Sequence, residues 1–295
     1  MVNMNLEWRL LDLEERNGSF NTALDIHLLE KIGNGEKPTL IFSTWKPTVS
    51  IGNAQNYSLD VDEKACKENN VEVVRRRSGG QAVFLDSNYF VFSIIGKPEL
   101  FPKDLTYLRK EICSLAVDTL NEFDVPAEFY QPDNIVVRYG DKFRTLGNSG
   151  QVITSKAIVV HGSVRYSLKN IDVMADVLKM NGQKLNSFES EIKMALTDVV
   201  AHNPIVDIRK LKDKFLKKFS DKYGAKFIKD ELKESEEGRI LEIGEELKKN
   251  VIGENEYKSR GICYLFLNGE NLVPALQKYL PTNKPSTWQE SMVRV

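Results

Sequence analysis

Cysteine is scarce in this sequence. The 295 residues include only three, Cys66, Cys113 and Cys263, which are widely separated and form no CxxC pair. An odd number of distant cysteines is not the pattern of a disulfide framework, and it offers no closely spaced thiol pair for a zinc site. The cysteine content therefore predicts a protein of a reducing compartment.

An excess of charge of either sign is also missing. The chain has 41 basic and 42 acidic residues, so no overall field favours nucleic acid or an anionic membrane as a partner. No apolar run approaches the length of a membrane span. The start, MVNMNLEWRLLDLEERNG, carries acids among its apolar residues, unlike a signal or transit peptide. We therefore expect a cytoplasmic protein with no nucleic-acid or membrane partner, and the sequence leaves its oligomeric state unknown.

The residues that are present suit a folded globular chain, with 41% hydrophobic and 28% charged residues. Apolar residues recur at helical spacing over residues 21–32 and 104–123, and a shorter helix is expected over 61–69. Stretches rich in β-branched and aromatic residues predict strands between these helices. The predicted strands cover residues 39–45, 48–52, 71–77, 81–86 and 89–96.

The second half of the chain begins with a predicted hairpin over residues 133–151, turning at Tyr139–Lys142, and a further strand within 155–168. Beyond about Val199 the composition shifts to two amphipathic helices, over 208–224 with Asp207 as N-cap, and over 235–250. Residues 261–269 suit a strand or a buried helix equally.

These elements predict an α+β fold, with a central mixed β-sheet flanked by helices and a small C-terminal α/β appendage. The length suits one large unit with a small addition. We place the boundary near Pro204, which gives a catalytic domain over residues 1–203 and an accessory domain over 204–295.

The segment VRRRSGGQAVFLD, residues 74–86, is the strongest candidate for a binding site. Guanidinium groups suit bidentate contact with phosphate or carboxylate, and adjacent glycines let backbone N–H groups approach an anion. In a regular strand Arg75 and Arg77 point to one face and Arg76 to the other, so only one or two should contact a ligand. The segment matches neither a P-loop nor a dinucleotide fingerprint. Taken alone, it is equally an ordinary basic strand end.

The order of several motifs resembles the lipoate-protein ligase A family of the biotin/lipoyl ligase superfamily. The motifs run from SFNTALDIHLLE through SIGNAQN and VVRRRSGGQAVFLD to KFRTLGNSGQ and VVHGSVRYSL. The resemblance covers roughly residues 7–200 and implies the catalytic fold of that superfamily. A biotin ligase shares this fold, but its glycine-rich loop differs from RRRSGG.

The resemblance also implies roles for individual residues. The arginine segment and an Asn/Asp pair would bind an acyl-adenylate. The pair stands here in reversed order, as Asp133 and Asn134, and Asp133 would also be the ligand of Mg²⁺. The place of the family's catalytic lysine, three residues before a glycine, holds Arg144, with Lys142 as an alternative cation nearby. The implied nucleotide residues are Arg75, Arg76, Ser78, Gly79, Gly80, Gln81, Ala82, Asn88, Asp133, Asn134 and Gly147, and the implied acyl pocket is Gly52, Gln55, His161 and Gly162.

Three positions depart from the family pattern in addition to the reversed pair. Gln81 stands where a third glycine is usual, Leu85 where a histidine is usual, and Arg144 where the lysine is usual. A guanidinium keeps the positive charge of an ammonium group but differs from it in bulk and shape. The resemblance therefore predicts acyl-adenylate binding more firmly than turnover.

The implied reaction is ATP-dependent activation of lipoate or octanoate, with Mg²⁺, to an acyl-adenylate. The acyl group would then pass to a lysine of a lipoyl-acceptor protein, either a lipoyl domain or a glycine-cleavage H-type protein. One alternative is an acyl-carrier-dependent octanoyl or lipoyl transferase. Relatives of that kind work through a cysteine thioester, and Cys113 on its predicted helix is in the wrong place for one. Another alternative is a family member that binds an acyl-adenylate or a partner without turnover.

Overall fold

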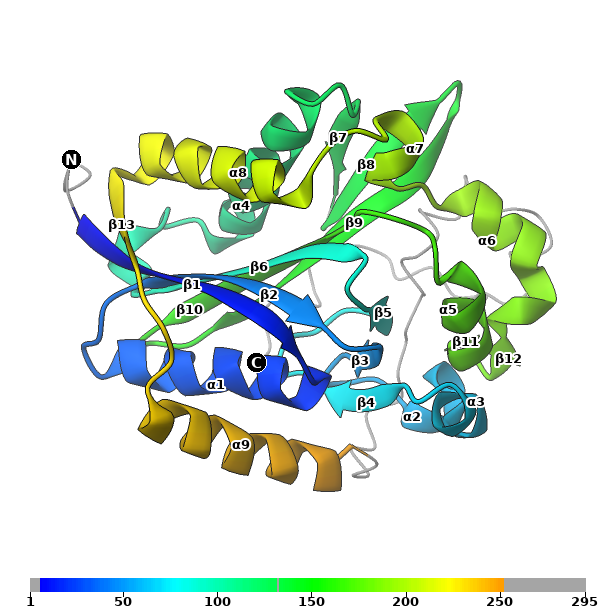
Figure 1. The fold of residues 1–295 in the computed structure, drawn as a ribbon, viewed down its shortest axis with the longest axis horizontal. Helices are drawn as coiled ribbons and strands as arrows, with labels where there is room; N and C mark the ends of the chain where they lie inside the picture. Colours follow the sequence, from blue (N-terminus) through cyan, green and yellow to red (C-terminus); the bar gives the residue numbers. More distant parts are fainter. Residues whose placement is uncertain (1–5, 132, 252–295) are drawn as a thin grey trace.

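The computed structural model describes residues 6–131 and 133–251. Within these ranges the centre of the molecule is a mixed sheet with the strand order β13-β1-β2-β6-β10-β9-β8-β7 (Figure 1). β1 runs parallel to β13 and to β2, and the other neighbouring pairs are antiparallel. The strands are β1 (Leu6–Arg16), β2 (Thr39–Trp45), β6 (Tyr89–Gly96), β7 (Ala127–Tyr130), β8 (Asn134–Tyr139), β9 (Lys142–Ile153), β10 (Ile158–Arg165) and β13 (Ala225–Lys229).

Helices cover both faces of this sheet (Figure 1). β6 shows how the sequence divides the two cores, since alternate side chains of a strand point to opposite faces. Phe92 and Ile94 pack under α4 and α8, whereas Ile95 packs under α1 and α9. None of the helices in the described ranges is long and apolar enough to cross a membrane. The four covering helices are α1 (Gly18–Gly33), α4 (Leu105–Asn121), α8 (Ile208–Tyr223) and α9 (Glu234–Lys249).

A smaller sheet with the order β4-β3-β5 lies beside the large one and has a core of its own. Short helices cover this smaller sheet, and the segment 76–82 connects β4 to β5. The elements of this part are β3 (Thr48–Ile51), α2 (Tyr57–Asp60), α3 (Glu63–Glu68), β4 (Glu72–Arg75), β5 (Val83–Leu85), α5 (Ile171–Val177), β11 (Lys179–Met180), β12 (Gln183–Lys184) and α6 (Glu189–Ala195). The next helix, α7 (Val199–His202), packs with Val199 in the core of the large sheet.

The predicted fold class is confirmed, because the central sheet is mixed and helices flank it. The hairpin is also confirmed, with Tyr139 opposite Lys142 and Gly140 in the left-handed region between them. The strands predicted at 39–45 and 48–52 both form, but they belong to different sheets. Periodicity predicts that a segment is a strand, but it does not predict which sheet the strand joins.

The expected boundary at residues 203 and 204 separates elements that the structure packs together. Phe215 and Phe219 of α8 are fully buried in the core on the sheet. β13 extends the large sheet by pairing with β1, and α9 packs on α1. The chain up to Val251 therefore belongs to the same packed unit. The segment 261–269 lies outside the described residues, so its nature and the accessory domain stay predictions.

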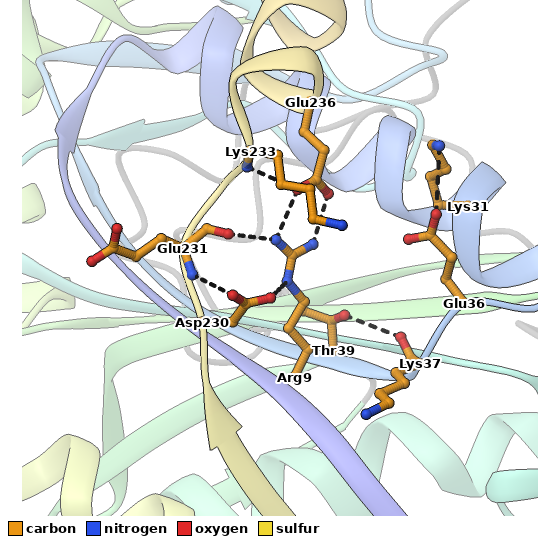
Figure 2. A network of polar contacts seen from close by, with 9 residues as sticks. All are labelled: Arg9, Lys31, Glu36, Lys37, Thr39, Asp230, Glu231, Lys233 and Glu236. Carbon is orange, nitrogen blue, oxygen red and sulfur yellow. Dashed lines mark hydrogen bonds and ion pairs between the residues drawn. The ribbon is translucent and has the colours of Figure 1, made fainter.

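A network around Arg9 attaches α9 to β1 (Figure 2). Arg9 donates from Nη1 to Glu236 Oε1 at 2.7 Å and from Nη2 to the Glu231 carbonyl at 2.7 Å, and its Nε lies 2.8 Å from Asp230 Oδ2. Glu236 also accepts from the Lys233 N–H at the start of α9. The Arg9 and Glu236 side chains are only 11% and 10% exposed, so this ion pair is better shielded than a surface pair.

Glu236→Gln should destabilise the fold in a pH-dependent way. Burial opposes ionisation of this carboxyl, but hydrogen bonds from Arg9 and Lys233 and the Arg9 charge lower its pKa to about 2. A lowered pKa stabilises the folded state above the unfolded pKa, and this stabilisation is lost as the pH falls. We expect the free energy of unfolding to drop by about 2 kcal/mol at neutral pH. The difference from wild type should shrink below about pH 4.5.

Urea denaturation at several pH values measures this difference. The matched control is Glu237→Gln, which removes the more exposed pair with Arg16. An equal loss in both variants, or a loss that does not change with pH, would contradict the role given to Glu236.

Candidate active site

A cavity of about 1010 Å³, including its opening to solvent, lies between α1, the α1-facing side of the large sheet and the small sheet. Its size suits a small-molecule site. Apolar side chains from α1, β2, β6, β9 and β10 share its wall with charged and polar ones. The apolar members include Ile26, Leu29, Trp45, Val91, Val152 and Val159, and the polar members include Asp25, Arg76, Arg77, Ser78, Asp133 and His161.

One wall of the cavity is the segment Arg76–Ala82 between β4 and β5, which we call the arginine loop. The half-buried Arg76 guanidinium organises this loop from within. It donates from Nη1 to the Ser50 carbonyl at 2.6 Å, and from Nη2 to the carbonyls of Gly79 at 2.8 Å and Gln81 at 2.7 Å. Burial lowers the pKa of Arg76 to about 10, so the group is still a cation at neutral pH.

The carbonyls that face Arg76 fix the direction of the neighbouring N–H groups. In a trans peptide the N–H of the next residue points away from the carbonyl, so the Gly80 and Ala82 N–H groups point away from the guanidinium. The Ser78 carbonyl accepts from the Asn53 N–H at 3.0 Å, which turns the Gly79 N–H away from Asn53. Within the described chain these three N–H groups have no hydrogen-bond partner, so they are available to an anion.

Gly52 and Gln55 lie behind the arginine loop and do not line the cavity. A Cβ at Gly52 would be 2.1 Å from the Gly80 carbonyl oxygen, so only glycine allows this approach. Gln55 accepts from the Gly52 N–H at 2.8 Å and donates to Gln81 Oε1 at 3.1 Å. Gln81, the departure from the family pattern, thus contacts Gln55 while it also lines the cavity.

Arg75 also holds the loop in place and does not line the cavity. Its Nη1 donates to the carbonyls of Gly52, Asn53 and Gln55 at 3.1, 3.2 and 2.8 Å. Its Nη2 donates to the Val251 carbonyl at 3.0 Å. Arg77 is exposed, lines the cavity and lies 3.9 Å from Glu30. Of the three arginines, only the third leaves its guanidinium open to solvent.

Ser78, His161 and Asp25 form a connected row on the cavity wall. Ser78 Oγ is 2.9 Å from His161 Nε2, and His161 Nδ1 is 3.2 Å from Asp25 Oδ2. Arg76 Nε donates to Ser78 Oγ at 3.0 Å, and Ser93 Oγ donates to Asp25 Oδ2 at 3.2 Å. The side chains of His161 and Asp25 are each 21% exposed, which leaves both open to the cavity.

The register of β10 puts His161 in this row, because it pairs with Ser93 of β6 on one side and Gly150 of β9 on the other. A Cβ at Gly150 would be 2.7 Å from His161 Nε2, so glycine leaves room for the imidazole. Gly162 lines the cavity beside it, and a Cβ there would overlap the Phe92 ring.

Asp133 lines the cavity just before β8, and Asn134 does not. The Asn134 amide donates to Asp133 Oδ1 at 3.1 Å, and Arg109 lies 3.8 Å from Asp133 Oδ2. Burial raises the pKa of Asp133, while the charges of Arg109 and Arg76 act against this rise. The residues of the described ranges contain no cluster of three His, Cys, Asp or Glu side chains around a metal site. Mg²⁺ is often held by one or two carboxylates with substrate phosphates, and Asp133 fits that mode.

Comparison with known proteins decides the family. A model described as the lipoyl protein ligase A/B catalytic domain matches residues 17–220, more than half of the chain. The chain belongs to this family. Octanoyltransferase LipM of Moorella thermoacetica is 28% identical over 262 residues, covering 80% of this chain and 93% of that protein. Lipoate-protein ligase LplJ of Bacillus subtilis is 29% identical over 167 residues, covering 57% of this chain and 48% of that protein.

A solved structure supports the fold assignment. The bipartite lipoate protein ligase of Thermoplasma acidophilum superposes with a TM-score of 0.71 at 22% identity, covering 85% of this chain and 96% of that chain. At this level of identity the likeness concerns the fold. The family model ends at residue 220, inside α8, in agreement with the packing of that helix on the central sheet.

In this member of the lipoyl ligase family, Arg144 does not line the cavity. Its guanidinium lies 4.2 Å from the centre of the Tyr139 ring. A bulge in the β8 and β9 pairing, between the pairs Ile135–Gly147 and Val136–Thr145, separates it from the part of β9 that reaches the cavity. Gly147 packs against the Ser163 carbonyl and Lys142 is exposed at the hairpin turn.

Leu85 and Asn88 are two further positions of the family pattern, and only Leu85 lines the cavity. Leu85, in place of the usual histidine, is buried and lines the cavity. Asn88 lies in the turn between β5 and β6, where its amide donates to Asp86 Oδ2 at 3.0 Å and its carbonyl accepts from the Tyr166 N–H at 2.8 Å. Asn88 is not among the residues that line the cavity.

The cysteines in the described ranges are Cys66 and Cys113, and neither lines the cavity. Both are buried, and burial raises the pKa of each thiol to about 12. A nucleophilic cysteine needs a lowered pKa and access to substrate. Cys263 lies outside the described residues.

Asp25, like Arg77, lines the cavity and was given no site role from the sequence. It stands in the quoted motif SFNTALDIHLLE, among apolar residues of a buried helix. Thr22 and Leu29 lie three residues before and four residues after it, and both line the same cavity. The helix carries two carboxylates, Asp25 and Glu30, and taken alone it does not show which of them faces a site.

Gly52→Ala should displace the arginine loop. The new Cβ would overlap the Gly80 carbonyl oxygen, which is backbone and cannot rotate away. We expect faster amide hydrogen exchange at Asn53 and Arg76, whose N–H groups donate to the Ser78 and Ile51 carbonyls. The melting temperature should fall by roughly 5 °C, as a loss of about 2 kcal/mol would give. Gly238→Ala on α9, where a Cβ meets nothing within 4 Å, is the control. Unchanged exchange at Asn53 and Arg76 in Gly52→Ala would refute the close packing.

Proposed function

We propose that this chain is an ATP-dependent lipoate-protein ligase. It activates lipoate or octanoate with ATP to an acyl-adenylate, and it then transfers the acyl group to a lysine of a lipoyl-acceptor protein. The family membership supports the acyl chemistry, and the architecture of the cavity supports the use of a nucleotide. The acceptor is a lipoyl domain or a glycine-cleavage H-type protein.

The observation that carries the proposal is the composition of the cavity wall. Apolar side chains such as Leu29, Val91 and Val159 offer a surface for a medium-length acyl chain. The same cavity has the arginine loop, whose outward N–H groups and nearby Arg77 charge suit a phosphate. An acyl-adenylate combines these two chemical characters in one molecule.

The residues can be given roles in adenylate formation. The substrate carboxylate attacks the α-phosphorus of ATP, pyrophosphate leaves, and negative charge builds on the phosphate oxygens. The N–H groups of the arginine loop and the Arg77 guanidinium would stabilise that charge. Asp133 would hold Mg²⁺ together with phosphate oxygens and water, and the ion when bound would offset phosphate charge. The acceptor lysine then attacks the acyl carbonyl, and AMP leaves.

An acyl-carrier-dependent octanoyltransferase is the second candidate, and the curated relatives favour it. The Moorella thermoacetica protein, which this chain matches over 93% of its length, is named an octanoyltransferase. Cys66 and Cys113 are buried and do not line the cavity, which argues against a thioester on either of them. The structural study of the Thermoplasma acidophilum bipartite ligase also covers its E2 lipoyl domain, which supports a lipoyl domain as acceptor in either case.

Pyrophosphate release distinguishes the two candidates. With ATP, Mg²⁺ and no acceptor protein, the ligase should release pyrophosphate when lipoate or octanoate is added. Asp133→Asn should slow this release by about 100-fold through the loss of one charged ligand. Glu122→Gln is the control, at an exposed carboxylate just after α4 that pairs with Lys214 and does not line the cavity. Octanoyl transfer from an acyl-carrier thioester with no acid-dependent pyrophosphate release would assign the chain to the octanoyltransferases.

Arg144 is proposed as the catalytic cation, which requires its guanidinium to leave the Tyr139 ring when ligand binds. Arg144→Ala should then lower the rate of pyrophosphate release by about 100-fold. The matched control is Arg138→Ala, because Arg138 lies on the same hairpin and pairs with Glu128 on the surface. Equal rates in the two variants would remove Arg144 from the catalytic residues and leave the cation role to the arginine loop.

A further inference from the structure

Ser78, His161 and Asp25 have the connectivity of a serine nucleophile with its base. Ser78 Oγ is 2.9 Å from His161 Nε2, and the other ring nitrogen, Nδ1, is 3.2 Å from Asp25 Oδ2. In a serine hydrolase triad the base uses the same two nitrogens for the same two partners. The three residues come from three separate parts of the fold: the arginine loop, β10 and α1.

The surrounding donors fix the direction of the protons in this row. Arg76 Nε can only donate, and it lies 3.0 Å from Ser78 Oγ, so the serine oxygen accepts from it. The Asp25 carboxylate can only accept, so His161 Nδ1 carries the ring proton and donates to Asp25 Oδ2, which also accepts from Ser93. In this neutral imidazole Nε2 has no proton and accepts from the serine hydroxyl. This tautomer leaves Nε2 ready to take the serine proton.

The row is placed where an acyl group would lie. Ser78 and His161 line the same cavity as the apolar side chains Leu29, Val91 and Val159. The Gly79 and Gly80 N–H groups next to Ser78 have no partner within the described chain and are exposed, so they are free to stabilise an oxyanion. A serine that only held the loop to the sheet would not need a carboxylate behind the histidine.

We propose that Ser78 accepts a medium-chain acyl group from a thioester without ATP, with His161 as its general base and Asp25 orienting the imidazole. The proposal rests on the acyl chemistry of the proposed function but not on its use of ATP. It gives the chain a covalent route to acyl transfer that needs no cysteine.

Ser78 Oγ attacks the thioester carbonyl while its proton moves to His161 Nε2, the C–S bond breaks, and the thiolate takes that proton and leaves as a thiol. The product is an acyl ester on Ser78. A neutral lysine amine of the acceptor then attacks the ester carbonyl and gives a proton to His161. That proton returns to Ser78 Oγ as the C–O bond breaks, which leaves an amide and the free enzyme.

The experiment uses the full chain with octanoyl-coenzyme A as the thioester and no ATP. We expect release of free coenzyme A thiol and one octanoyl group on the peptide that contains Ser78, detected by mass spectrometry. Ser78→Ala should carry no octanoyl group, while Ser114→Ala, at a serine on α4 outside the cavity, should be acylated like wild type. His161→Asn and Asp25→Asn should slow thiol release by about 100-fold or more.

Ser78→Cys separates a chemical role from a structural one. It should retain acylation at residue 78 but form a thioester, which neutral hydroxylamine cleaves far faster than the serine ester. Melting temperatures of all variants identify any that fail to fold, and the wild-type protein alone is sufficient to decide. Neither thiol release nor acylated Ser78 in wild type would overturn the proposal.

An assay of the same preparation for lipoate-dependent pyrophosphate release distinguishes the ligase proposal from the serine-nucleophile proposal. Pyrophosphate release without acylation of Ser78 supports the ligase and removes the serine nucleophile. Acylation of Ser78 without pyrophosphate release supports the serine nucleophile and removes the ligase. If Ser114 or lysines carried as much octanoyl group as Ser78, the acylation would be non-specific, and this result would also overturn the proposal.

Discussion

The half-buried Arg76 guanidinium needs hydrogen-bond acceptors, and this need determines the shape of the whole site. A guanidinium away from water needs hydrogen-bond acceptors, and here the backbone carbonyls of Ser50, Gly79 and Gln81 and the Ser78 hydroxyl accept from four of its five N–H groups. Because these carbonyls turn inward, the N–H groups of the loop turn outward. One cation inside the loop thus produces both an anion-binding surface and a serine hydroxyl with a fixed direction.

The strands supply the second half of this arrangement. β10 lies between β6 and β9, and its register puts His161 opposite Ser93 and Gly150. A shift of one residue would turn His161 to the opposite face, under α4 and α8, and bring Val160 into the cavity. Gly150 and Gly52 are the points at which backbone and site come too close for any side chain. The site therefore depends on contacts between elements far apart in the sequence.

Local features of the sequence predicted much of the fold. The helices over α1, α4, α8 and α9 and the hairpin of β8 and β9 follow from periodicity and turn residues, because these signals lie within one segment. The packing of α8 and β13 on the central sheet depends on partners more than 200 residues away, such as Trp8 against Phe219. Composition changes near Val199, but the packed core continues, so a boundary drawn from composition does not follow the core.

The same distinction applies to the site. Arg76, Ser78, Gly80, Asp133 and His161 were predicted, and they line one cavity, because each lies within a motif that resembles the family. Alternation along the strand did not predict the placement of Arg144, since the bulge in β9 interrupts it. Nor did it predict that Arg75 donates to three carbonyls of the segment after β3. Bulges and buried hydrogen bonds are settled by tertiary structure.

Phosphate binding and a serine nucleophile are physically compatible in this one loop. A phosphate bound at the outward N–H groups does not compete for the four Arg76 N–H groups that already bond the Ser78 hydroxyl and three carbonyls. The hydrogen bond from Arg76 to Ser78, and the tautomer of His161 that Asp25 sets, therefore persist with or without a nucleotide. The acyl carbonyl would lie beside the same N–H groups in both reactions, and the leaving group, AMP or a thiol, distinguishes them.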